Sequence, residues 1–260
     1  MEKRTGWRGA GALAAALFVA AGAGCGGSSG DGLGTVTVFA ASSLTEAFTE
    51  LGARLEDDHP GTTVTFNFAS SSDLALQVTE GAPADVFASA DPIQMRRVED
   101  AGTAENPVPF ATNELIVLVP DDNPAGIEVP EDVTKPGVKL VLAAPEVPAG
   151  NYARRAFEAL GIAADAEANV VSNEDDVKTV VAKVSLGEAD AGVTYVTDVT
   201  DEIENNVDVI EFPAEVGVRA IFPITVLADA PNPEGAKAFY ELVLSEEGDR
   251  VLASYGFGRP

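Results

Sequence analysis

Hydroxyl-bearing and small residues gather where predicted strands pass into predicted helices. Two such junctions, 39–45 and 68–74, share the pattern Phe-Ala-x-Ser-Ser, and three more lie at 147–152, 173–177 and 192–195. A helix start presents free backbone N–H groups and a partial positive charge, to which serine hydroxyls add further donors. This chemistry indicates a site for a small anion that needs no Lys or Arg. At any single junction, however, Ser or Asn could simply be a helix cap.

Other kinds of site find less support. The chain has one His and one Cys, which excludes most multi-ligand His/Cys metal sites and any internal disulfide. The acidic clusters at 56–58, 121–122 and 174–176 lack the spacing of a calcium loop. A secreted hydrolase with a Ser nucleophile would need His59 as its base, but His59 ends a predicted helix in a polar run. The hydrolase is kept only as an alternative.

The overall charge gives a different indication from the junctions. Of the 260 residues, 42 are acidic and 16 basic, for a formal charge of −26. This balance argues against nucleic acid as a partner, because affinity for phosphate backbones comes mostly from Lys and Arg. Taken alone, it suggests a cationic ligand, which conflicts with an anion site at the junctions. A hydrophobic fraction of 46% is ample for a packed core.

Alternating strands and helices would position the junctions. Short apolar runs predict strands at 35–40, 62–68, 85–89, 115–119, 138–143, 170–171, 190–195, 207–212 and 221–228. Amphipathic stripes and caps predict helices at 43–58, 72–80, 91–102, 151–160, 177–187, 232–243 and 245–255. The first helix carries a capping box that begins at Ser43. This order predicts parallel sheets flanked by helices, with ligands at the carboxyl ends of strands.

The N-terminus has the pattern of a secretory signal. Basic residues precede an apolar run at 10–21, which is shorter than the ~20 residues of a membrane-spanning helix. The segment resembles a bacterial lipoprotein signal, in which 1–24 is removed and Cys25 is lipidated. It departs from that pattern at Gly22, where Leu is usual, so ordinary secretion with a free Cys is the alternative. The Gly- and Ser-rich stretch 25–34 is then a flexible tether.

Several segments together resemble the molybdate-binding proteins of bacterial ABC uptake systems. In order, they are TVFAASSLTEAF, FASSSDLALQVTEGAPADVFASAD, VPAGNYARRA, EDDVKTVVAKV, GVTY and SYGF, and the match runs through nearly all of 35–257. The resemblance implies an α/β protein of the type II periplasmic-binding-protein fold, with the ligand between two lobes that are each a mixed sheet flanked by helices. The first lobe would comprise 35–113 and 222–260, and the second 114–221.

The resemblance also implies a ligand set. Ser43 and Ser71 would donate hydroxyl and backbone hydrogen bonds to molybdate or tungstate, Ala149 and Val177 would donate backbone N–H groups, and Tyr195 would donate its phenol O–H. The metal enters only as the centre of the anion, with no direct protein ligand, and no cofactor is expected. The protein would be a monomer and not an enzyme.

The implied partners are an ABC permease with its cytoplasmic ATPase, and a membrane that holds the lipid on Cys25. Two further alternatives stay open at this point. One is a receptor for another oxyanion or a small organic anion. The other is a lipid-anchored sensory or adhesion domain that uses the same fold without transport.

Overall fold

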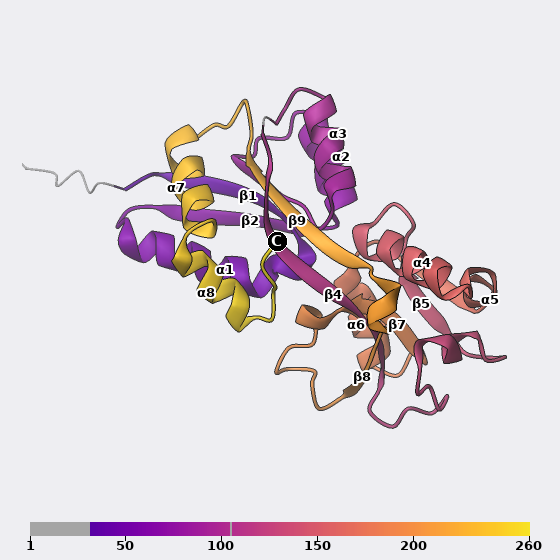
Figure 1. The fold of residues 1–260 in the computed structure, drawn as a ribbon. Coiled ribbons are helices and arrows are strands. Elements are labelled where there is room, and N and C mark those ends of the chain that lie inside the picture. The colour runs from indigo at the N-terminus through magenta and orange to yellow at the C-terminus, as the bar shows by residue number, and fades with distance from the viewer. Residues whose placement is uncertain (1–31, 105) are drawn as a thin grey trace, which may run out of the picture.

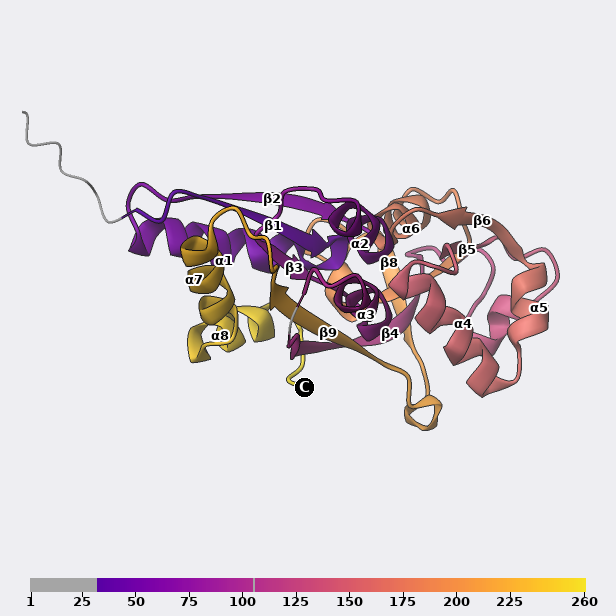
Figure 2. The ribbon, with the colours of Figure 1, turned by 90° about the horizontal axis from the view of Figure 1, so that it is seen from above.

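The computed structural model describes residues 32–104 and 106–260, so the predicted signal and Cys25 lie outside the described residues. Two groups of strands and helices lie at opposite ends of the molecule, and two long antiparallel strands run between them (Figure 1, Figure 2). These crossing strands are β4 (Val108–Pro120) and β9 (Arg219–Val226). Among the described residues, no helix is long and apolar enough to cross a membrane.

The first lobe contains the start of the described chain and its end. Its strands are β1 (Thr35–Ala41), β2 (Thr63–Ala69) and β3 (Val86–Ala88), and its helices are α1 (Thr45–Asp58), α2 (Ser71–Thr79), α3 (Pro92–Asp100), α7 (Pro233–Val243) and α8 (Glu246–Ser254). The strand order is β2-β1-β3-β9-β4. β1 is parallel to both β2 and β3, whereas β9 is antiparallel to β3.

The second lobe comes from the middle of the chain. Its strands are β5 (Leu140–Ala143), β6 (Val170–Glu174), β7 (Ala191–Tyr195) and β8 (Val207–Glu211), and its helices are α4 (Pro148–Leu160), α5 (Ala163–Ala168) and α6 (Val177–Ser185). The described residues also form 3-10 turns, which are η1 (Ser42–Leu44) in the first lobe and η2 (Pro130–Thr134), η3 (Val196–Asp198) and η4 (Ala214–Val216) in the second. The strand order is β4-β7-β5-β6, and β8 also pairs with β4.

Both sheets are therefore mixed. The alternating pattern predicted parallel sheets, and β4 and β9 depart from it because each crosses between the lobes and pairs antiparallel with its neighbours. The mixed two-lobed fold implied by the resemblance is confirmed. The predicted lobe borders at 113/114 and 221/222 fall inside β4 and β9, and they stay a prediction.

A chain of aromatic contacts connects the core of the first lobe with the second lobe. Phe239 packs against Phe48, Phe48 against Phe110, and Phe110 against Phe222, with ring centroids 5.4, 5.7 and 6.4 Å apart. Phe222 on β9 then meets the ring of Tyr195 at the end of β7, at 5.8 Å. Because edge-to-face rings pack at such distances, the crossing strand fixes the position of Tyr195.

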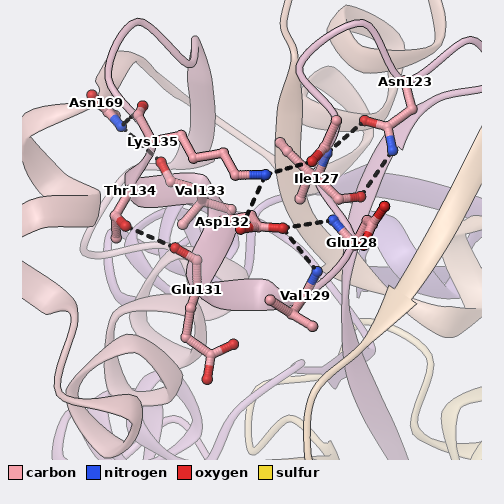
Figure 3. Close-up of polar contacts among 11 residues, drawn as sticks. Asn123, Ile127, Glu128, Val129, Glu131, Asp132, Val133, Thr134, Lys135 and Asn169 are labelled. Carbon is pink, nitrogen blue, oxygen red and sulfur yellow. Dashed lines mark hydrogen bonds and ion pairs between the residues drawn. The ribbon is translucent and has the colours of Figure 1, made fainter.

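Polar contacts hold the long connection between β4 and β5, some within the connection and some from Asn169 at the end of α5 (Figure 3). The Asn123 side chain both donates to and accepts from the backbone of Ile127, at 2.8 and 2.9 Å. The Asn169 amide donates to the carbonyls of Val133 and Lys135, at 2.8 and 2.9 Å. These bonds satisfy backbone groups that no strand pairs, as buried or half-buried polar groups require.

Candidate functional site

One pocket lies between the lobes, where strand ends meet helix starts. Its empty volume, adjoining open solvent included, is about 200 Å³. It is lined by Ala41, Ser42, Ser43, Ala69, Ser70, Ser71, Ala90, Val147, Pro148, Ala149, Val177 and Tyr195. All of these residues except the half-buried Ala69 are buried. The structure thus brings together all five residues predicted as ligands, from five separate segments of the chain.

Ser43 is not a helix cap, and the predicted capping box is wrong. A 3-10 turn comes first, so α1 begins at Thr45 and no side chain caps it. Thr45 instead donates its hydroxyl to the carbonyl of Ser42 at 2.6 Å. Ser43 is 3% exposed. Its Oγ has no hydrogen-bond partner among the described residues, so the hydroxyl is free for a ligand.

Ser71 is the first residue of α2, and its neighbour Ser70 is the cap. The backbone N–H of Ala90 donates to Ser71 Oγ at 2.9 Å. Because this bond occupies an acceptor position of the hydroxyl, the proton of Ser71 remains available as a donor. This role of Ala90 was not predicted, although the segment that contains it is part of the resemblance.

The second lobe contributes two helix starts. Ala149 is the second residue of α4, after Pro148, and Val177 is the first residue of α6, where Asp176 accepts from Thr179 N at 2.9 Å. N–H groups in a helix's first turn have no intrahelical partner, so both can donate into the pocket. The predicted start of α4 at 151 was three residues late, although Pro is favoured at the first helical position.

Gly150 explains how α4 can begin so close to β5. A Cβ at this position would collide with the carbonyl oxygens of Ala143 and Ala144 at the carboxyl end of that strand. Only glycine leaves room for this approach. The close packing places the N–H groups of the first turn at the pocket.

Tyr195 closes the pocket from the end of β7. It is 1% exposed, and its phenol oxygen has no partner among the described residues. Burial raises the pKa of Tyr195 well above its ordinary value, and Tyr152, Asp198 and Asp91 act in the same direction. The phenol therefore stays protonated and can serve as a hydrogen-bond donor.

Charged groups stand beside the pocket but do not line it. Lys178 Nζ donates to both carboxylate oxygens of Glu46, at 2.9 and 3.0 Å, and lies 3.8 Å from Asp198 Oδ1. The other oxygen of Asp198 accepts the backbone N–H of Tyr195 at 3.0 Å. Burial raises the pKa of Asp198 to about 6, against the opposing effect of Lys178. No motif or spacing in the sequence had marked Glu46, Lys178 or Asp198 as part of the site.

A wider hollow lies elsewhere, between β4, β8 and η4. Its charged lining residues are Glu114, Glu211 and Arg219. Four buried side-chain oxygens lack a hydrogen-bond partner among the described residues, and none of them belongs to this hollow. Two of the four, Ser43 Oγ and Tyr195 OH, belong to the interlobe pocket. Unpaired donors thus distinguish the smaller pocket.

Neither metal chemistry nor hydrolysis fits this pocket. Among residues 32–104 and 106–260, no group of His, Cys, Asp and Glu side chains could hold a metal ion. The pocket lining, all of it described, includes no carboxylate, amine or imidazole that could activate Ser43 or Ser71. His59 ends α1, as predicted.

Residues 36–258 match the family of bacterial extracellular solute-binding proteins. The chain belongs to this family. It is 41% identical to the molybdate-binding protein ModA of Mycobacterium tuberculosis over 88% of this chain and 86% of that protein. The predicted resemblance is thereby confirmed. Members of the family bind solutes and do not transform them, so the expectation that the chain is not an enzyme is also confirmed.

Solved structures of proteins that are named for different ligands show the same fold. The periplasmic molybdate-binding protein of Azotobacter vinelandii superposes with a TM-score of 0.76 at 17% identity, over 86% of this chain and 99% of that one. The sulfate-binding protein SubI of Mycobacterium tuberculosis gives 0.71 at 16% identity, over 87% of each chain. At these identities the likeness establishes the fold, and the choice of anion must be argued from the pocket.

Proposed function

We propose that this protein captures molybdate, and tungstate by the same geometry, outside the cytoplasm and delivers it to an ABC permease. Ser43 and Ser71 would donate hydroxyl and backbone hydrogen bonds from the first lobe. Ala149 and Val177 would donate backbone N–H groups from the second lobe, and Tyr195 its phenol O–H.

The observation that carries this proposal is the pair of buried, unpartnered hydroxyls, Ser43 Oγ and Tyr195 OH, that belong to pocket residues on opposite lobes. A buried polar group without a partner is costly. Such groups persist in a site whose ligand supplies the missing bonds. Several donors are needed because a dehydrated dianion must replace its water shell, and hydrogen bonds to a charged acceptor are the stronger kind.

The chemistry of the lining favours a fully deprotonated tetrahedral anion. The helix starts and the Tyr195 phenol present donors, and the Ser71 oxygen already accepts from Ala90. A protonated ligand would place a donor against these donors. The likeness to the curated molybdate-binding relative supports molybdate as the anion of this class.

Transport follows from closing of the two lobes. A ligand held from both lobes favours the closed form by a population shift, and that form would be recognised by the permease and its ATPase. We further propose that the protein acts as a monomer held at the membrane by a lipid on Cys25, a residue outside the described part of the chain.

Thermal unfolding of the mature protein with molybdate, tungstate, sulfate and phosphate tests the ligand. A receptor with ligand at about 1,000 times Kd gains about 4 kcal/mol of stability, so molybdate or tungstate should raise the melting temperature strongly. Stabilisation by sulfate or another anion alone would instead favour the second candidate, a receptor for a different oxyanion, which the shared fold of the sulfate-binding protein makes worth testing.

A further inference from the structure

The ion pair between Glu46 and Lys178 joins the two lobes beside the pocket. Glu46 lies on α1 in the first lobe, three residues after Ser43, and Lys178 lies on α6 in the second lobe, directly after Val177. The amine donates to both oxygens of the carboxylate, at 2.9 and 3.0 Å. Each partner is thus tied by the backbone to a residue that lines the pocket.

Asp198 stands behind this pair within the second lobe. Its side chain is fully buried, and Oδ1 lies 3.8 Å from Lys178 Nζ. Oδ2 accepts the N–H of Tyr195, the pocket residue with the free phenol. If the lobes separate, Lys178 keeps Asp198, which moves with it, and loses Glu46. The Glu46 contact is therefore the one that depends on closure.

We propose that Glu46 and Lys178 form an interlobe latch, positioned by Asp198, that slows release of the bound anion without touching it. The inference rests on the proposed function, because it concerns how long that ligand stays. The latch side chains are 36% and 29% exposed. A partly buried pair is screened less by salt than a fully exposed one, so its loss should be measurable.

A neutral contact across the cleft offers a comparison. Gln94 Nε2 on α3 donates to the carbonyl of Glu146, just before α4, at 3.0 Å. This bond also joins the lobes, and it carries no formal charge. The change in dissociation rate on losing the ion pair should therefore depend on salt concentration, whereas the change on losing the Gln94 bond should not.

The test is the rate of molybdate dissociation from Glu46→Gln, Lys178→Met and the double variant, measured by stopped-flow at low salt. Each single change should speed dissociation about fivefold. The double variant should dissociate little faster than either, since the two single changes remove the same contact. The increase in dissociation rate should be smaller at 0.5 M salt, which screens the ion pair of the original protein. Lys178→Arg, which keeps the charge, should stay close to the original rate.

Matched controls remove the same charges where no interlobe contact exists. Glu50→Gln lies one turn further along α1 and breaks a pair with Arg54 inside the first lobe. Lys183→Met lies on α6 and breaks a pair with Glu174 inside the second lobe. Neither should change the dissociation rate.

Additive effects of the two single changes, or rates equal to those of the controls, would overturn the latch. An effect of Lys178→Met without one of Glu46→Gln would overturn it too, since the contact would then lie within one lobe. If molybdate fails to bind, the proposed ligand is wrong, and the same rates are measured with whichever anion stabilises the protein. If no anion binds, both proposals fail.

Discussion

Two neighbouring regions of the cleft handle charge in opposite ways. The pocket is lined by neutral residues, and its buried hydroxyls on Ser43 and Tyr195 lack protein partners. The latch beside it sets one amine, Lys178, between two carboxylates, Glu46 and Asp198. The neutral donors of the pocket are available to an anion, whereas Lys178 is already paired with Glu46 and holds the two lobes together.

The neutral lining also explains how an acidic protein could bind an anion, although its overall charge suggested a cationic ligand. The chain carries a formal charge of −26, and such a field slows the encounter with an anion. In the proposed site, binding would instead depend on local donors at the starts of α2, α4 and α6. The acidic surface therefore gives no information about the sign of the ligand.

Placing a charge in the pocket should have the largest effect. Ser43→Asp puts a carboxylate next to the proposed dianion with no basic residue in the lining, and molybdate affinity should fall about 1,000-fold or more. Ser43→Ala removes only a donor and should cost about 10- to 100-fold. Calorimetric titration measures both, and equal losses would mean that the pocket does not depend on neutrality.

Removing the charge of Asp198 should stabilise the protein in a pH-dependent way. The pKa of Asp198 is about 6 in the folded protein, above the ordinary 3.8. The protonated carboxyl therefore contributes its full share to the free energy of unfolding below about pH 4, and this contribution is lost as the pH rises through 6. Relative to the original protein, Asp198→Asn should gain about 3 kcal/mol of unfolding free energy between pH 4 and 8. Denaturant unfolding checks this, and a difference that stays constant with pH would contradict it.

Deleting a backbone donor should weaken binding without harming the fold. Val177 is the first residue of α6, a position where Pro is tolerated, so Val177→Pro removes one N–H from the pocket. Molybdate affinity should fall about 30-fold. Val177→Ala keeps the N–H and serves as the control, and similar losses in both variants would assign the effect to packing.

The phenol of Tyr195 should affect binding and stability in opposite directions. Tyr195→Phe removes a donor from the ligand and should weaken molybdate binding about tenfold. Because the buried O–H has no partner among the described residues, its removal should leave the melting temperature of the ligand-free protein unchanged or higher. A clear fall in stability would show that the hydroxyl has a structural bond.

Local features of the fold were predictable from the sequence. Asp91 before Pro92 and Asn232 before Pro233 predicted the starts of α3 and α7, and both side chains do cap their helices. The five strand-to-helix junctions rich in hydroxyl-bearing and small residues also meet at one pocket, because such junctions lie at the carboxyl ends of strands. In each case the signal lies within a few residues of the chain.

Features that depend on distant partners were not predictable. The first half of β4 is polar at Thr112 and Asn113, and it is held by Gly258 and Thr197. The capping box failed for a different reason, since a 3-10 turn can use the same residues as a cap. The latch joins positions 132 residues apart, and no spacing rule connects them.

The most direct test of the proposed pocket is the position of molybdenum in crystals of the complex, located by anomalous scattering. The peak should lie between the lobes, within hydrogen-bonding range of Ser43 and Tyr195 through the oxygens of the anion. The lobes should be closed over it, with Glu46 and Lys178 in contact. A peak elsewhere, such as the hollow beside Arg219, or a molybdenum atom bonded directly to a protein side chain would contradict the account.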